Sequence, residues 1–220
     1  PLAAPGFLIL LLHDVPPTAA RGLGTLLGRL AARDRLIGPA QAEAILTGAA
    51  PVPPGPPRLL LTFDDGFVSN RAVAETILDP LGVRALFFVC PGLVDLKPAA
   101  QAAAVGRTIL RGQRPAPEPL MSWDDLDALT AAGHVVASHT MTHPRLAGLA
   151  PDALAEEVGA AAGALHRRLG RCDWFAFPFG DEASVDSAAL ARDRARVVLV
   201  GKTGPAVDYA ACMKKELSLM

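Results

Sequence analysis

Two adjacent carboxylates, Asp64 and Asp65, directly follow the apolar run Leu59–Phe63 and precede Gly66. The run has the length of a buried strand, and ligands of α/β folds bind at the carboxyl ends of the strands. An Asp-Asp-Gly sequence is by itself an ordinary turn. Two adjacent like charges repel each other, however, and a nearby cation relieves this repulsion. The motif therefore predicts either a plain turn or an acidic site that holds a cation.

A second group of potential ligands is the pair His139 and His143, which follows the apolar run Val135–Ser138. Histidines four residues apart can meet on one face of a helical turn and bind one metal through imidazole nitrogens. Surface histidines at this spacing also occur by chance. Together with Asp65 from another strand end, the pair makes a set of two nitrogens and one oxygen. Such a set leaves a position open for water, which is typical of a hydrolytic metal site.

A third segment, Trp174–Gly180, runs from a strand pattern into an aromatic-proline-aromatic-glycine turn. Its residues Phe177, Pro178 and Phe179 are candidates for a groove wall against which sugar rings stack. Asp181 follows them as a candidate substrate contact. A packed strand end with a proline turn explains this segment equally well when it is taken alone.

Six strand-length apolar runs alternate with helical patterns along the chain. The predicted strands are Phe7–Leu12, Leu59–Phe63, Ala85–Val89, Val135–Ser138, Trp174–Phe177 and Val197–Val200. The predicted helices are Leu23–Asp34, Val68–Leu78, Ala99–Leu110, Trp123–Ala132, Pro151–Leu169 and Ser184–Arg194. Runs that are apolar on consecutive positions are typical of parallel strands covered on both faces. The alternation predicts an α/β fold, either an open doubly wound sheet or a barrel.

His13 and Asp14 end the first apolar run, so they are expected at the same mouth as the acids and the histidine pair. His13 is therefore a candidate for contact with substrate or with a metal ligand. Ser122, directly before the predicted helix at Trp123, and Gly133, directly after it, are ordinary signals for the start and the end of a helix.

The 220-residue chain has a formal net charge of −1, with acidic and basic residues interspersed. No basic patch predicts binding to nucleic acid or to a membrane surface. Its 3 cysteines form no CxxC pair, so neither a disulfide framework nor a thiolate zinc site is expected. The run Phe7–Leu12 is too short to span a bilayer and lacks the basic start of a secretion signal. We expect a soluble protein, either cytoplasmic or exported with its leader removed, whose residues 1–220 form a single domain.

Together, the three motifs resemble those of the polysaccharide deacetylase family, also called the NodB-homology or carbohydrate esterase family 4 group. Thr62–Gly66 is similar to the family's TFDDG motif, and Ser138–Pro144 is similar to its H(S/T)xxHP motif, in the expected order. The third motif looks closer to the poly-N-acetylglucosamine deacetylase branch, which also lacks the arginine that many members carry at the position of Ala176. The resemblance extends from His13 to about Gly180.

The family implies a distorted, incomplete (β/α) barrel of about seven parallel strands. By this resemblance Asp64 is the general base, and the ligands of a divalent metal are Asp65, His139 and His143. Zinc is the first expectation for the metal, with Co²⁺, Ni²⁺ or Mn²⁺ as alternatives. The backbone N–H of Phe67 is a candidate donor to the oxyanion that forms on the substrate.

The activity that the resemblance implies is removal of acetyl groups from an N-acetylated carbohydrate by metal-activated water. Removal of O-acetyl esters, as from xylan, is an alternative because the same chemistry serves both. The family's last motif supplies a histidine as general acid, whereas no histidine follows His166 here. The tail Val207–Met220 also lacks the pattern of a barrel-closing strand and helix, which indicates truncation or divergence. A catalytically impaired glycan-binding domain and a bare α/β scaffold with incidental histidines are therefore further alternatives.

Overall fold

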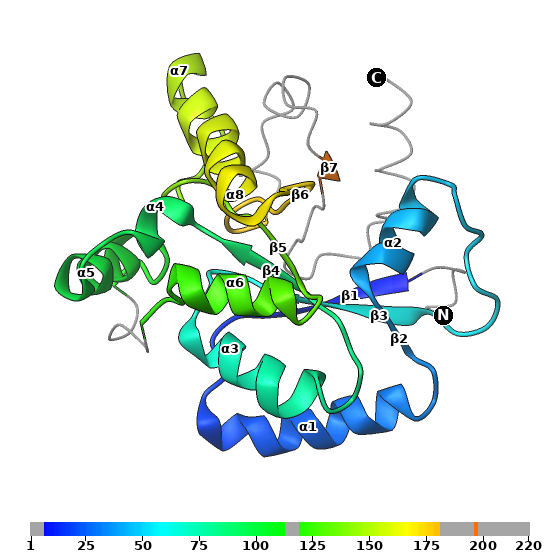
Figure 1. The fold of residues 1–220 in the computed structure, drawn as a ribbon. Coiled ribbons are helices and arrows are strands. Elements are labelled where there is room, and N and C mark those ends of the chain that lie inside the picture. The colour runs from blue at the N-terminus through cyan, green and yellow to red at the C-terminus, as the bar shows by residue number, and fades with distance from the viewer. Residues whose placement is uncertain (1–6, 113–118, 181–195, 198–220) are drawn as a thin grey trace.

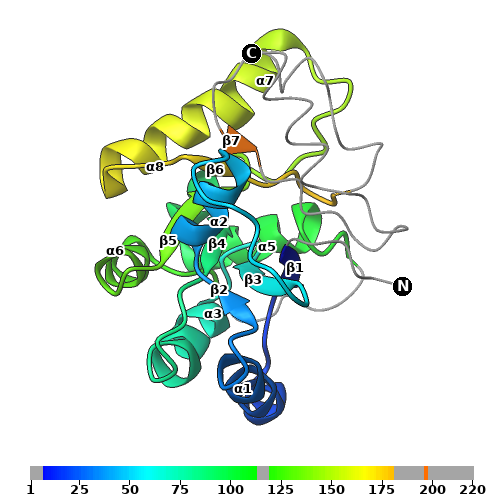
Figure 2. The ribbon, with the colours of Figure 1, turned by 90° about the vertical axis from the view of Figure 1, so that its right-hand side faces the viewer.

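The computed structural model describes residues 7–112, 119–180 and 196–197 (Figure 1). Its strands form one seven-stranded, parallel sheet in the order β1-β3-β4-β5-β6-β7, with β2 paired to β3. The strands are β1 (Phe7–Leu12), β2 (Leu36–Ile37), β3 (Arg58–Phe63), β4 (Leu86–Val89), β5 (Val135–Ser138), β6 (Trp174–Phe175) and β7 (Arg196–Val197). The sheet is curled and has helices around its outside (Figure 2). The predicted incomplete (β/α) barrel is therefore confirmed.

Helical segments connect these strands. They are α1 (Pro17–Ala31), α2 (Pro39–Leu46), α3 (Val68–Val73), the π-helix η1 (Ala74–Leu78), α4 (Pro91–Val94), α5 (Pro98–Thr108), α6 (Trp123–Ala131), α7 (Pro151–Leu154), the π-helix η2 (Ala155–Ala160) and α8 (Ala161–Leu169). The predicted start of α6 is confirmed, because the Ser122 side chain and the Asp125 side chain each accept a bond from the other's backbone N–H. None of the helices that the structure describes has the length and apolar character needed to cross a membrane.

The distortion of the barrel begins at β3. Strand β1 pairs with β3 along its whole length, from Arg58 to Phe63. Strand β2 pairs with Leu59 and Leu60, whereas β4 pairs with Thr62 and Phe63. Because a strand has only two edges, β2 and β4 must share the second edge of β3. This arrangement displaces β4 toward the carboxyl end of β3, where the two aspartates follow.

The sheet has an apolar face on each side because successive side chains of a strand point in opposite directions. On the outer face, Phe63 and Phe87 stack with ring centroids 4.9 Å apart and pack against helices α1, α3, α6 and α8. On the inner face, Leu60, Phe88 and Trp174 pack with residues of α2. Full burial of each such side chain contributes about 1.5–3 kcal/mol, so the two faces together hold the strand ends in place.

Some predicted elements differ from the observed ones. The short segments β2, α2 and α4 were not predicted, and β6 ends at Phe175 instead of Phe177. The predicted helix Ser184–Arg194, residues 198–200 of the last predicted strand and the tail Val207–Met220 lie outside the described residues. The single domain expected over residues 1–220 stays a prediction.

Candidate metal centre and active site

The two aspartates lie at the carboxyl end of β3, where the backbone turns sharply. The N–H of Asp64 donates to the carbonyl oxygen of Leu12, 2.9 Å away, so this residue still continues the sheet. Asp65 and Gly66 then adopt left-handed conformations, with φ angles of 73° and 77°. A Cβ atom on Gly66 would lie 2.9 Å from Cγ1 of Val89. The turn therefore requires glycine at position 66, and it holds Asp65 in a left-handed conformation that is uncommon for residues other than glycine.

The segment from His139 to His143 is a loop, not the helical turn that the spacing predicts. Thr140 and His143 have φ angles of 72° and 66°, which no helix contains. The hydroxyl of Thr140 accepts the N–H of His143 at 2.9 Å, and this bond closes the loop. The helical interpretation was wrong, yet the loop still brings both imidazoles to one point.

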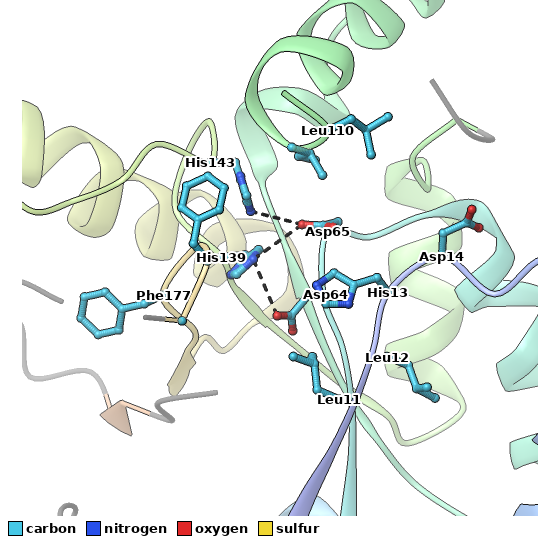
Figure 3. A pocket seen from close by; sticks show the side chains of 13 residues that line it. Leu11, Leu12, His13, Asp14, Asp64, Asp65, Leu110, His139, His143 and Phe177 are labelled. Atoms are coloured by element: carbon cyan, nitrogen blue, oxygen red, sulfur yellow. Dashed lines mark ion pairs between the residues drawn. The ribbon is translucent and has the colours of Figure 1, made fainter. Parts of the chain in front are cut away.

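The side chains of Asp65, His139 and His143 converge at the mouth of the barrel (Figure 3). One potential ligand atom from each lies within 4.8 Å of the others, and all three residues are buried. Oδ1 of Asp65 lies 3.6 Å from Nε2 of His139 and 3.3 Å from Nε2 of His143. The structure thus brings together the predicted ligand set from two distant stretches of the chain.

Backbone carbonyls determine which imidazole nitrogens can bind a metal. Nδ1 of His139 lies 2.9 Å from the carbonyl oxygen of Ala176, and Nδ1 of His143 lies 3.3 Å from that of Thr108. A carbonyl oxygen only accepts, so the Nδ1 atom of each histidine carries a proton. Burial, and then the neighbouring charge of His143, lowers the pKa of His139 to about 3. A bare Nε2 of His139 therefore faces the carboxylate of Asp65, an arrangement that a shared cation stabilises.

The two carboxyl groups differ in their protonation behaviour. Burial, followed by the charge of Asp65, raises the pKa of Asp64 well above its usual value. Burial alone would raise the pKa of Asp65 too, but its hydrogen bond to His143 and the charges of the two imidazoles lower it. Oδ2 of Asp64 lies 3.8 Å from Nε2 of His139, and its Oδ1 has no hydrogen-bond partner among the described residues. Such a split is typical of a proton-transferring carboxyl beside a charged one.

A cavity of about 580 Å³ opens above these residues. Its lining consists of Leu11, Leu12, His13, Asp14, Asp64, Asp65, Ile109, Leu110, His139, His143, Phe177, Phe179 and Gly180. This volume lies within the range of about 300–1,000 Å³ that is usual for small-molecule sites, and it suits a sugar unit. Three predicted substrate contacts, His13, Phe177 and Phe179, lie in the lining.

Strand alternation explains why polar residues meet here. In a strand, residues an even number of positions apart face the same side of the sheet. Leu11, Leu60 and Ala137 face the inner side, so the residues that follow them at the ends of β1, β3 and β5, which are His13, Asp64 and His139, face that side too. The sequence motifs gave no reason to expect Ile109 and Leu110, which directly follow α5.

Two of the predicted contacts do not line the cavity. Pro178 is buried, and the Phe67 side chain is fully buried in a separate apolar cluster with Leu93 and Leu120. The role suggested for Phe67 concerns its backbone N–H, and that role stays a prediction. Asp181 lies outside the described residues.

Several residues that support the site were not predicted. Asn70 is fully buried, and its Nδ2 donates to the carbonyl oxygen of His13 at 2.8 Å. Ser69 accepts the N–H of Val15 and donates to Asp14. Both follow the TFDDG motif closely in sequence, at the start of the predicted helix Val68–Leu78, and this placement was the available signal.

Comparison with known proteins places the chain in a family. The sequence profile described as polysaccharide deacetylase matches residues 52–196, which is well over half of the chain. The chain belongs to the polysaccharide deacetylase family. The family resemblance of its three motifs is thereby confirmed. No curated protein sequence matches this family member.

Solved structures share the fold of this polysaccharide deacetylase family member. The Streptococcus pyogenes deacetylase PplD, in complex with acetate, matches with a TM-score of 0.65 and 17% identity over 96% of this chain and 81% of its own. IcaB from Ammonifex degensii matches with a TM-score of 0.63 and 25% identity over 86% of this chain and 80% of its own. A de-N-acetylase from Aggregatibacter actinomycetemcomitans matches with a TM-score of 0.64 and 17% identity over 94% of this chain and 99% of its own.

Proposed function

We propose that this chain is a metal-dependent hydrolase that removes N-acetyl groups from an amino-sugar polymer or glycan. The convergence of Asp65, His139 and His143 beside a cavity of suitable size carries this proposal. Two nitrogens and one carboxylate oxygen form a donor set that suits Zn²⁺ and leaves a position open. Membership of the polysaccharide deacetylase family supports the same chemistry.

A divalent ion held by Asp65, His139 and His143 would polarise the acetyl carbonyl and lower the pKa of a nearby water. Asp64 takes the proton of that water. Burial raises the pKa of Asp64, and this makes its carboxylate a stronger base toward water. The carbonyls of Ala176 and Thr108 keep the two imidazoles in the orientation in which Nε2 faces the site.

His13 is our candidate for the group that protonates the leaving amine. An amine leaves readily only after it has received a proton. His13 lines the same cavity as Asp64 and directly follows β1, whereas the histidine pair follows β5 (Figure 3). It approaches the site closely enough for its charge to lower the pKa of both Asp65 and His139.

The test is acetate release from N-acetylglucosamine oligomers, measured before chelation, after chelation and after return of Zn²⁺. We expect release that disappears on chelation and returns with the metal. Acetylated xylan serves as the second substrate. Release from xylan alone would favour an O-acetyl esterase, and oligomer binding without any acetate release would favour a glycan-binding domain. Release that chelation leaves unchanged would contradict the metal dependence.

A further inference from the structure

We propose that the mouth of this site binds an oxyanion of the substrate, a carboxylate or a phosphate, through Arg111 lying on the ring of Phe179. The inference rests on the proposed function, because it names the class of acetylated sugar that the same cavity accepts. That class is an acetamido sugar that carries the anion itself or is joined to an anionic neighbour.

Phe179 connects the anion site to the metal centre. It lines the cavity, and its ring lies edge-on to that of His143 with centroids 4.8 Å apart. The Cζ atom of Arg111 lies 3.7 Å from the centroid of the Phe179 ring, and that of Arg145 lies 5.0 Å from it. A guanidinium in contact with Phe179 is thus only one ring removed from a candidate metal ligand.

The stacked position prepares Arg111 for an anion. A guanidinium that lies on an aromatic ring contacts it through its flat face, so its N–H groups point outward in the guanidinium plane. These donors match the two oxygens of a carboxylate or a phosphate. Arg111 is exposed, and no carboxylate in the described part of the chain forms an ion pair with it. This exposure leaves the guanidinium of Arg111 within reach of a substrate.

The backbone at this position supports a specific role for the side chain. Arg111 follows the end of α5 with a φ of 50°, in the left-handed region that favours glycine. Gly112 is left-handed as well, with a φ of 68°. A bulky residue in this conformation is strained, and such strain concentrates where a side chain is required at one place.

The charges around the cavity favour an anion at its mouth. The cavity lining contributes the carboxyls of Asp14, Asp64 and Asp65. A divalent ion at the metal centre would offset the last two, and Ser69 donates to Asp14 at 2.9 Å. The guanidinium group of Arg111 then places a positive charge on the Phe179 side of the mouth. A neutral homopolymer has no charged group that would interact with this positive charge.

The experiment compares binding of neutral and anionic oligosaccharides by titration calorimetry on the zinc-loaded chain. The probes are N-acetylglucosamine oligomers, hyaluronan oligomers of equal length, in which every second sugar is a uronic acid, and N-acetylglucosamine 1-phosphate. The last two probes distinguish a carboxylate from a phosphate. The wild-type chain should bind an anionic probe more tightly than the neutral one, and the preference should shrink as salt is added.

The decisive variant is Arg111→Ala, with Arg107→Ala as its control. Arg107 is also exposed and lies about one helical turn before Arg111, in the last turn of α5. Its replacement by alanine removes the same charge as Arg111→Ala. The ratio of anionic to neutral affinity should fall about tenfold in Arg111→Ala, as expected for loss of a charge-assisted hydrogen bond, and should stay at the wild-type value in Arg107→Ala. An equal ratio in the wild type and both variants would overturn the inference. Acetate release, recorded alongside, judges the proposed function separately, because the affinity ratio does not depend on turnover.

Discussion

The Nδ1 atom of His139 lies 2.9 Å from the backbone carbonyl oxygen of Ala176. This bond joins the Ser138–Pro144 motif to the Trp174–Gly180 segment. It is made at Ala176, the position at which the family resemblance leads one to expect an arginine. The backbone of the Trp174–Gly180 segment orients a candidate metal ligand, while Phe177 and Phe179 of the same segment line the cavity. The third motif therefore contributes to the site even without the arginine.

Replacement of Asp64 by asparagine tests its role as the base. Asparagine has nearly the same shape but cannot accept the proton of water, so acetate release should fall by about a hundredfold or more. Metal content should remain that of the wild type, because Asp64 is not one of the three converging ligands. Asp152→Asn, an exposed site in the first turn of α7, is the matched control. Turnover near the wild-type rate in Asp64→Asn would remove the base assignment.

Glu157 holds the histidine loop from outside and should influence metal affinity without touching the metal. It lies in the π-helix η2, and its carboxylate accepts the N–H of Thr142 at 2.8 Å and the hydroxyl of Thr142 at 2.5 Å. Loss of these bonds in Glu157→Ala frees the loop that carries His143. We expect zinc affinity to fall about tenfold in a competition titration with a chromophoric chelator.

The control for this variant is Glu156→Ala, which removes the same charge from the adjacent, exposed position. Its zinc affinity should equal that of the wild type. Equal affinities in Glu157→Ala and Glu156→Ala would show that the loop keeps its conformation without Glu157.

Gly66→Ala should destabilise the fold, because a left-handed φ of 77° disfavours alanine and the new Cβ would lie 2.9 Å from the buried Val89. We expect the free energy of unfolding to decrease by about 2 kcal/mol or more in urea denaturation. Gly22→Ala is the matched control, since it lies in the exposed part of α1 with open space around it. That variant should be more stable than the wild type by about 0.5–1 kcal/mol. A Gly66→Ala midpoint at or above the wild-type value would contradict the account of the turn.

We expect the buried imidazole of His134, which lies outside the candidate metal site, to make the free energy of unfolding depend on pH. Its Nδ1 accepts the N–H of Ala85 at 3.2 Å, so its Nε2–H faces Asp79, also at 3.2 Å. Burial lowers the pKa of His134 from 6.5, against the opposing charge of Asp79. The unfolded chain therefore binds the proton first as pH falls below about 6.5, and the free energy of unfolding decreases there.

This effect is measured by urea denaturation of the metal-free protein at about pH 7.5 and about pH 5.5. The wild type should lose stability between these values, and His134→Gln should lose less, because glutamine does not titrate. His139 contributes in the same direction in both proteins and cancels in the comparison. Equal losses in the two proteins would contradict a pKa lowered by burial at His134.

The strands and the ligand set were predictable because their signals are local. Runs such as Leu59–Phe63 are apolar on consecutive positions, which buried parallel strands require. Each motif follows such a run directly, so the parallel sheet had to bring Asp65 and His139 to the same edge. The short segments β2 and α4 could not be predicted from a local signal, because two to four residues show no periodicity.

Features set by tertiary contacts could not be predicted in this way. The loop that carries Thr140 and His143 is hydrogen-bonded at Thr142 to Glu157, a residue in another element that no local pattern connects to the histidine motif. The contact between Arg111 and Phe179 likewise joins residues from distant segments. Spacing alone favoured a helical turn for the two histidines, whereas the N–H of Met141 in their loop donates to the carbonyl oxygen of Glu157 in η2.

The most direct test of the metal centre is anomalous diffraction at the zinc absorption edge from crystals soaked in Zn²⁺. We predict a single strong peak at the mouth of the barrel, about 2.0–2.2 Å from Nε2 of His139, Nε2 of His143 and a carboxylate oxygen of Asp65. A map with no peak in contact with these three side chains would contradict the account.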